Sequence, residues 1–274
     1  MKQELYPESF YRIDDNMSIE KVFKAKESGS FLVATVLSWN PYYKALEAAL
    51  GNGFIGIIPF EEITIYPIPK NEIKKASYIS ELLGQTICVC VQKVVDGVIT
   101  LSRKANMKKT LDILFKNSSK ELTCCVKAFD RYGVFVDIGH GLSGRISLKN
   151  LSSCFIHSPS DMGIHPGQTL SAKIVSYNKE RNHFEVSYRE TFENLNLTEN
   201  LNAGDIINVL VLEPVDKIKS GYYVQINPNS VGILNPKDND YRNVIPFGTY
   251  VSARVRQKPK NGKIRLAFVS YVSN

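Results

Sequence analysis

The sequence contains few cysteines, a single tryptophan and no long apolar run. Its five cysteines are an odd, sparse set among 274 residues: Cys88, Cys90, Cys124, Cys125 and Cys154. This disfavours a secreted protein framed by disulfides and leads us to expect a reducing, cytoplasmic location. No stretch of about eighteen apolar residues occurs, so we expect no membrane partner, and the polar first residues lack the basic and apolar regions of a signal peptide.

The short motifs that carry catalysis or bind metals are also missing. There is no Gly-x-Ser-x-Gly elbow, no Gly-Lys-Ser/Thr phosphate loop and no His-Glu-x-x-His. The cysteines show no paired C-x-x-C spacing of structural zinc, and Cys154 with His157 makes only half a site. We therefore expect a protein that is not an enzyme and holds no metal or cofactor.

The composition is that of a folded protein with a basic excess. Hydrophobic residues make up 43% of the chain, charged residues 22%, and the net charge is +7, which permits a polyanionic partner. The excess concentrates near the C-terminus, in Arg254, Arg256, Lys258, Lys260, Lys263 and Arg265. The hairpin predicted there either contacts phosphates or only promotes solubility.

Three segments of the chain repeat one pattern, which indicates one scaffold used three times. Each segment has a glycine followed by apolar residues, then a second glycine that opens an alternating strand, and finally a closing strand. The first glycines are Gly56, Gly144 and Gly232, the second are Gly84, Gly167 and Gly248, and the closing strands end near Ser102, Ser187 and Ala267. The stretch from the second glycine to the closing strand is nearly constant in length, while the loop before it varies.

Short strands with period-2 alternation fill each repeat, and about five strands in a unit this small predict a closed barrel. We place the repeats at 29–104, 120–190 and 202–270. A polar segment with a short helix, Ser18 to Lys26 with Ser18 as its cap, occupies 1–28, and a linking helix is expected over 105–119. The predicted fold is mainly β, with three tandem five-stranded barrels and short linking helices.

The second strand of each repeat separates an inward set of side chains from an outward set. The inward sets are Leu46, Ala48 and Leu50; Val134, Val136 and Ile138; and Tyr222, Val224 and Ile226. The outward sets are Ala45, Glu47 and Ala49; Phe135 and Asp137; and Tyr223, Gln225 and Asn227. An outward Phe135 is either a stacking platform for a nucleic-acid base, with Tyr132 beside it, or it packs under a loop or against a neighbouring repeat.

Cations recur at one position of the fourth strand. Lys173 and Arg254 stand six residues after their second glycines, where the first repeat has Cys90, and Arg256 continues the same face. Lys149, Arg181 and His183 belong to loops of the second repeat that could flank the rings. Aromatic rings for bases and cations for phosphates are what single-strand binding requires, although any one of these charges alone is usually just solvated.

The stretch from Asp130 to Gly139 resembles the hallmark of the S1 RNA-binding domain, and so does the stretch from Gly167 to Ser187. The resemblance is strongest over the second repeat, clear over the first and weakest over the third. It implies five-stranded oligonucleotide-binding (OB-fold) barrels of the S1 type that bind single-stranded RNA without chemistry.

The family's binding positions carry over in part. In the second repeat its two aromatic positions fall on Tyr132 and Phe135, its histidine position on Ser147, its aspartate position on Asn178, and its basic position on His183, or on Arg181 if the turn is shifted. In the first repeat the corresponding positions hold Lys44, Glu47 and Pro59, and in the third Ser220, Tyr223 and Asn235. Trp39, Tyr42 and Tyr43 either compensate in the first repeat or serve packing.

The second repeat is therefore the best candidate RNA site, the third ranks next by charge, and the first resembles a structural or docking module. The candidate RNA-binding residues are Tyr132, Phe135, Ser147, Lys149, Lys173, Arg181, His183, Tyr223, Arg254 and Arg256. The sequence favours a monomeric protein of translation or RNA metabolism that binds single-stranded RNA with little sequence specificity. Two alternatives stay open: an adaptor docked on the ribosome or an RNA-processing complex, and a hybrid of both roles.

Overall fold

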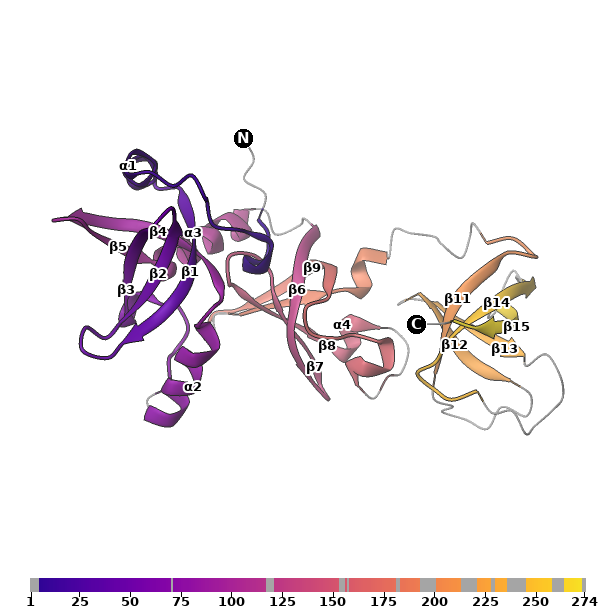
Figure 1. The fold of residues 1–274 in the computed structure, drawn as a ribbon. Helices are drawn as coiled ribbons and strands as arrows, with labels where there is room; N and C mark the ends of the chain where they lie inside the picture. The colour runs from indigo at the N-terminus through magenta and orange to yellow at the C-terminus, as the bar shows by residue number, and fades with distance from the viewer. Residues whose placement is uncertain are drawn as a thin grey trace. The chain divides into compact units, whose positions relative to one another are not determined.

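Three five-stranded barrels follow one another along the chain, which confirms the predicted fold class (Figure 1). The computed structural model describes residues 5–69, 71–116, 121–152, 156, 158–180, 183–192, 201–212, 221–227, 230–235, 245–257 and 264–272. The chain divides into two compact units. The first comprises Met1–Cys125, Asp137–Gly144 and Tyr177–Phe184, and the second comprises Val126–Val136, Arg145–Ser176 and Glu185–Asn274.

All three barrels have the same strand order, in which the third strand pairs with the fifth and the fourth pairs with the first. Barrel one contains β1 (Phe31–Asn40), β2 (Ala45–Gly51), β3 (Phe54–Pro59), β4 (Thr86–Val95) and β5 (Val98–Ser102). Barrel two contains β6 (Glu121–Asp130), β7 (Gly133–Asp137), β8 (Ser143–Ser147), β9 (Thr169–Asn178) and β10 (His183–Ser187). Barrel three contains β11 (Ile206–Val211), β12 (Tyr222–Asn227), β13 (Ser230–Asn235), β14 (Tyr250–Gln257) and β15 (Ile264–Tyr271).

The first glycine of the repeat provides room where the third and fifth strands run parallel. A Cβ atom on Gly56 would lie 2.4 Å from the Leu101 side chain, and one on Gly232 would lie 3.0 Å from the carbonyl oxygen of Ile264. Any side chain at these two positions would push the strands apart. The repeated glycine seen in the sequence therefore marks the closest approach of two strands within a barrel.

The second glycine of the repeat is needed for its positive φ angle and not for space. Gly84, Gly167 and Gly248 have φ angles of 74°, 85° and 76°, and a Cβ atom on any of them would meet nothing within 4 Å. Such positive φ angles strain residues that carry a side chain. Each of these glycines donates its N–H to a carbonyl oxygen at 2.8 Å; the acceptors are Val36, Val126 and Val211. The same turn thus leads into the fourth strand three times.

The barrel interiors hold most of the side chains predicted to point inward. Those of β2 and β7 are at most 2% exposed, and so is Val224 of β12, whereas Tyr222 and Ile226 pack at the edge of that core. Three residues predicted to point outward are buried. Ala45 lies at the end of β2 between β1 and β3, Asp137 is covered by the N-terminal segment, and Gln225 is covered within the second unit, where it bonds Ser152.

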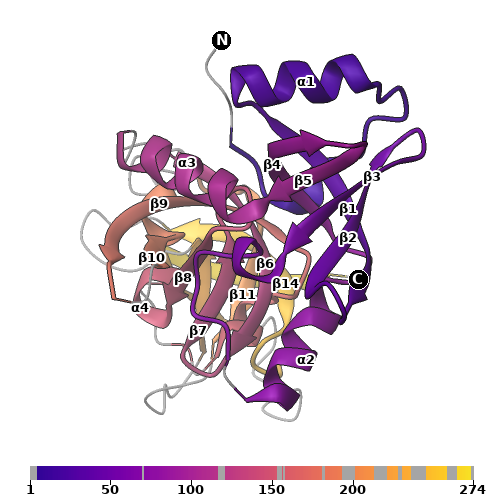
Figure 2. The ribbon, with the colours of Figure 1, turned by 90° about the vertical axis from the view of Figure 1, so that its left-hand side faces the viewer.

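Helices cover parts of the first unit. Helix α1 (Ile19–Ser28) begins as predicted at Ser18, whose hydroxyl accepts from the Lys21 N–H, and α3 (Arg103–Lys116) forms the expected linking helix. Both helices pack against β4 (Figure 2). Helix α2 (Glu72–Leu82), capped by Asn71, was not predicted from the sequence; of its residues only Ile79 is buried. Within the described residues, no helix is long and apolar enough to cross a membrane.

A buried ion pair holds the N-terminal segment to barrel one. The short 3₁₀-helix η1 (Glu8–Phe10) carries Glu8, whose carboxylate accepts from Nε of Arg103 at 2.9 Å and from its Nη2 at 2.6 Å. The carboxylate also accepts from the backbone N–H of Cys88 on β4 at 3.0 Å. Both charged side chains are almost completely buried. Such a pair compensates its desolvation because the geometry is bidentate and a further hydrogen bond is made.

The loop between β7 and β8 is bound to the same segment. The backbone N–H of Glu8 donates to Oδ2 of Asp137 at 2.9 Å, while Oδ1 of Asp137 accepts from the N–H groups of Gly139 and Gly141. The guanidinium of Arg103 lies so close to Gly141 that a Cβ atom there would be 2.2 Å from it. Asp137 therefore orders its own loop and caps the N-terminal segment, which explains its burial.

His140 completes this cluster as a buried, neutral side chain. Its Nε2 lies 3.1 Å from the hydroxyl of Tyr11, and its Nδ1 lies 3.0 Å from Oγ1 of Thr110 and 3.2 Å from Nδ2 of Asn106. Its ring lies 4.4 Å from that of Phe31, centroid to centroid. Burial lowers the pKa of His140 to about 4, and the nearby Glu8 carboxylate opposes this shift only in part. The imidazole is therefore uncharged at neutral pH.

Replacing Glu8 with glutamine should lower the free energy of unfolding of the first unit by about 3–5 kcal/mol, because it leaves Arg103 buried without a counter-charge. Urea denaturation followed by circular dichroism measures the effect. Glu72→Gln is the matched control, since Glu72 is exposed and its partner Lys75 lies 3.6 Å away on the surface. Equal unfolding midpoints for the two variants would contradict the role assigned to the pair.

The protein should lose stability below neutral pH because of His140. Its pKa is about 6.5 in the unfolded chain and about 4 when folded, so the unfolded state binds more protons between these values. The stabilisation is complete above pH 6.5 and is lost as the pH falls toward 4; between about pH 7 and about pH 5 the loss is about 2 kcal/mol. Urea denaturation at both pH values measures it. His140→Asn, which suits the positive φ at this position, should remove this part of the pH dependence; an unchanged pH dependence would refute the assignment.

Candidate nucleic-acid interface

The turn between β6 and β7 places two aromatic side chains on the outside of barrel two. Oδ1 of Asp130 accepts from the backbone N–H of Tyr132 at 2.7 Å, which fixes the turn. A Cβ atom on Gly133 would lie 2.3 Å from the carbonyl oxygen of Ile146, so only glycine allows β7 to approach β8 this closely. The Tyr132 and Phe135 side chains are 54% and 38% exposed. Phe135 is therefore not packed under a loop.

Each of these two rings has a guanidinium group beside it. Arg131 lies over the ring of Tyr132 at 4.5 Å from its centroid and also donates to the Tyr132 hydroxyl. Arg145 of β8 lies 6.0 Å from the centroid of the Phe135 ring. Aromatic faces stack on bases, and guanidinium groups bind phosphate oxygens or join the stack. Neither arginine was among the residues predicted from the sequence, although Arg131 lies within the hallmark stretch.

Two buried polar atoms on β8 have no hydrogen-bond partner among the described residues, namely Nε of Arg145 and Oγ of Ser147. Ser147 stands at the N-cap of the short helix α4 (Leu148–Leu151) but its side chain makes no capping hydrogen bond. A donor and a hydroxyl left unpaired are costly unless a ligand or water pairs them. Lys149, on the same helix, is exposed. Tyr132, Phe135, Ser147 and Lys149 therefore come from neighbouring turns and strands of one barrel.

The other cations predicted for barrel two are placed differently. The ammonium group of Lys173 donates to the carbonyl oxygen of Glu190 at 2.7 Å, so this half-buried side chain is engaged within the protein. His183 begins β10 and is half-buried. Arg181 lies outside the described residues, while Asn178 ends β9 with its side chain exposed.

Barrel three presents its cations but not its tyrosine. Arg254 and Arg256 are both exposed on β14. Tyr223 is half-buried and packs on the apolar cluster of Leu210 and Leu212. The remaining basic residues of the predicted hairpin, Lys258, Lys260 and Lys263, lie outside the described residues, as does Ser220.

Barrel one has aromatic side chains in its first loop instead of on β2. Trp39 packs edge-on against Phe60, with ring centroids 5.8 Å apart, so it serves packing. Tyr42 and Tyr43 are 85% and 72% exposed, and the N–H groups of both donate to Oδ1 of Asn40. On β2 itself, Glu47 accepts from the Ser38 hydroxyl and the Asn40 amide.

The cysteines are unsuited to reaction or metal binding. Burial raises the pKa of the Cys88 and Cys90 thiols, so both stay protonated at neutral pH. Cys124 and Cys125 are also buried, whereas Cys154 and His157 lie outside the described residues. Among the described side chains, no group of three or more His, Cys, Asp or Glu residues gathers in a way that could hold a metal ion.

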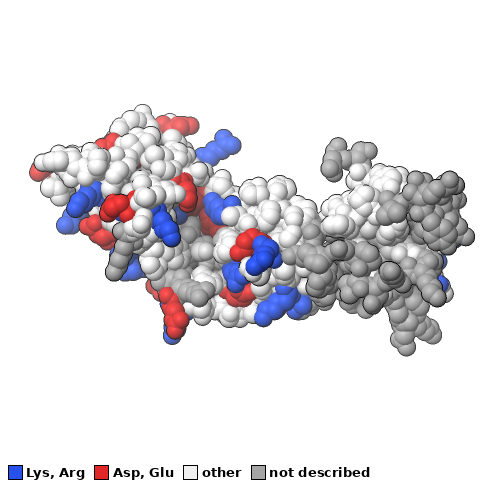
Figure 3. Space-filling view, turned by 90° about the horizontal axis from the view of Figure 1, so that it is seen from below, with Lys and Arg blue, Asp and Glu red and all other residues white. Residues whose placement is uncertain are grey.

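Charges of both signs are interspersed on the face of the molecule that Figure 3 shows. Lys and Arg side chains lie beside Asp and Glu side chains there, so the described part of this face carries no continuous basic field. On this face, attraction for a polyanion therefore depends on local groups of charged side chains.

A family model matches the part of the chain that carries the candidate interface. The model of the "S1 RNA binding domain" matches residues 120–189. Small ribosomal subunit protein bS1 of Staphylococcus saprophyticus is 28% identical over 168 residues, 57% of this chain and 41% of that protein. The bS1 homolog of Bacillus subtilis is 27% identical over 112 residues, 40% of this chain and 28% of that protein. The chain thus spans less than half the length of these relatives.

Solved structures resemble the chain at low identity. A multidomain protein with nucleic acid binding domains from Streptococcus pneumoniae is 15% identical, and the match covers 88% of this chain and 73% of that chain with a TM-score of 0.29.

Proposed function

We propose that this chain binds single-stranded RNA; the match of the S1 RNA binding domain model to residues 120–189 supports this. The observation that carries the proposal is the exposed pair Tyr132 and Phe135 with Arg131 and Arg145 beside the rings. Two bases stack on the rings, and the guanidinium groups bind the flanking phosphates. Stacking accepts any base, so binding has little sequence preference.

The unpaired atoms beside the rings fit the same role. A 2′-hydroxyl or phosphate oxygen would accept from Nε of Arg145, and the hydroxyl of Ser147 would pair with a sugar or base group. Lys149 adds a phosphate contact, while Arg254 and Arg256 supply cations on barrel three. Several modest sites on one chain raise the overall affinity through effective concentration. The chain performs no chemistry on the RNA and needs no metal or cofactor.

Its place in the cell follows from the named relatives. One is a small ribosomal subunit protein and the other is named as a homolog of it, which supports a role in translation or RNA metabolism in the bacterial cytoplasm, with the ribosome as an associated partner. We further propose that the chain is a monomer. Because the chain spans only 41% of the first relative, this assignment is carried by the shared S1 domain and not by the whole protein.

A second role, docking on a protein partner, is favoured by barrel one. Its β2 carries Glu47, whose charge opposes RNA, where barrel two has Phe135. Its first loop exposes Tyr42 and Tyr43, and Ile55 nearby in the sequence is 52% exposed. Aromatic and apolar side chains without a gathered set of cations suit a protein surface better than a phosphate backbone.

The proposal is tested by fluorescence anisotropy with a labelled single-stranded RNA of mixed sequence, beside the matching duplex, at low and moderate salt. We expect micromolar or tighter binding that selects the single strand and weakens as salt rises, because phosphate contacts release counterions. Absence of binding at low salt would overturn the proposal and favour the docking role.

Replacing Phe135 with alanine should weaken binding of single-stranded RNA by about 1–3 kcal/mol, because one stacking platform is lost while the barrel core is untouched. The same anisotropy titration measures the change. Phe23→Ala on α1 is the matched control, since Phe23 is also exposed and lies outside barrel two. Equal affinities of the Phe135 variant and the parent would refute the stacking assignment.

A further inference from the structure

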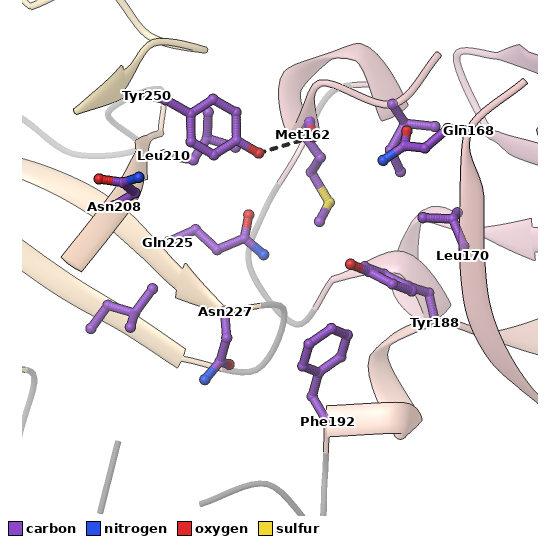
Figure 4. A pocket seen from close by; sticks show the side chains of 12 residues that line it. Met162, Gln168, Leu170, Tyr188, Phe192, Asn208, Leu210, Gln225, Asn227 and Tyr250 are labelled. Atoms are coloured by element: carbon purple, nitrogen blue, oxygen red, sulfur yellow. Dashed lines mark hydrogen bonds between the residues drawn. The ribbon is translucent and has the colours of Figure 1, made fainter. Parts of the chain in front are cut away.

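The second unit contains a cavity that the RNA-binding face of barrel two does not include (Figure 4). Its volume is about 300 Å³, at the lower end of the range for small-ligand sites. One wall comes from the 3₁₀-helices η3 (Pro159–Met162) and η4 (Arg189–Phe192) and from the residues near them; the other comes from β11, β12 and the start of β14. The cavity therefore lies between parts of barrels two and three that both belong to the second unit.

Rings and carboxamides dominate the cavity lining. Tyr188 and Phe192 lie edge to face with ring centroids 5.0 Å apart, and the Tyr250 ring lies on the opposite side (Figure 4). The hydroxyl of Tyr250 donates to the carbonyl oxygen of Met162 at 3.1 Å, which fixes that ring. The amides are Gln168, Asn208, Gln225 and Asn227, and the described residues of the lining include no Lys, Arg, Asp or Glu.

Gln225 has a buried acceptor that no residue in the described part of the chain satisfies. Its side chain points into the cavity from β12 and is 5% exposed (Figure 4). Its Nε2 donates to the Ser152 hydroxyl at 3.0 Å, whereas its Oε1 is buried and has no partner. A buried acceptor without a partner costs free energy that a ligand carrying an N–H group would recover.

We propose that this cavity binds one nucleobase with an exocyclic amino group, inserted between the rings and bonded to Oε1 of Gln225. Aromatic walls bind the base faces, and the carboxamides bind its polar edge. Adenine and cytosine present an amino group as a donor, whereas uracil presents carbonyl oxygens on both sides of its single ring N–H. The inference rests on the proposed RNA binding and adds a base preference that the stacking face of barrel two lacks.

The source of the base is an RNA strand rather than a free nucleotide. Among the residues that the structure describes, the cavity lining offers no cation for a phosphate. Tyr250 on its rim is exposed and lies on the same face of β14 as Arg254 and Arg256, which are also exposed. Four residues of a strand span about 13 Å, so Arg254 would meet a phosphate about two nucleotides from the inserted base.

The test uses the full chain and two labelled ten-nucleotide RNAs, one of adenosine and one of uridine, in anisotropy titrations at fixed salt. We expect the adenosine RNA to bind more tightly. Gln225→Met should weaken it about fivefold, because one hydrogen bond is lost, and leave the uridine RNA unchanged. Gln257→Met is the matched control, an exposed glutamine at the end of β14 outside the cavity lining.

Phe192→Leu should weaken the binding of the adenosine RNA about tenfold, because a stacking ring is lost. Circular dichroism checks that each variant folds.

The outcomes separate this inference from the proposed function. Binding of both RNAs that depends on Phe135 but not on Gln225 or Phe192 would overturn the cavity assignment and leave the proposed function intact. No binding of either RNA would overturn the proposed function. Adenosine monophosphate, titrated by calorimetry, should bind at least tenfold more weakly than the adenosine RNA. Equal affinity, lost in Gln225→Met, would overturn the assignment of the base to a strand.

Discussion

The bidentate ion pair of Glu8 and Arg103 is the constraint around which the first unit is arranged. A carboxylate removed from water needs every oxygen paired, and Glu8 meets this with Arg103 and the N–H of Cys88. The pair fixes η1 against β4 and α3, and the backbone of Glu8 then provides the donor that Asp137 requires. The loop of barrel two that carries His140 is thereby bound to the same cluster.

Features that depend only on the local backbone conformation, or on the space beside it, could be predicted from the sequence. The paired glycines of each repeat are visible because room between strands and a positive φ are needs that glycine meets. The Ser18 cap is visible for a similar reason. The burial of Asp137 and Gln225 was predicted wrongly, because the groups that cover them come from residues 129 and 73 positions away. Alternation along one strand contains no information about such partners.

In the candidate interface, too, the features set by local sequence could be predicted and those set by distant residues could not. The exposed rings of Tyr132 and Phe135 follow from a turn and an alternation that the sequence displays. Arg145 does not, since only the pairing of β7 with β8 places its guanidinium near Phe135. Chain neighbours therefore define the stacking surface and one of its guanidinium groups, and a neighbouring strand supplies the other. In barrel three, Tyr223 is packed while Arg254 and Arg256 stay exposed.

The position of Glu8 so early in the chain has a consequence for synthesis on the ribosome. Barrel one can close once β5 has emerged, but Arg103 follows that strand and Asp137 comes 129 residues after Glu8. At about 5–20 residues per second, the nascent N-terminal segment waits about 6–26 s for its last partner. Co-translational folding therefore proceeds from barrel one to barrel two, and the segment around Glu8 reaches its final place only after the loop that carries Asp137 has been made.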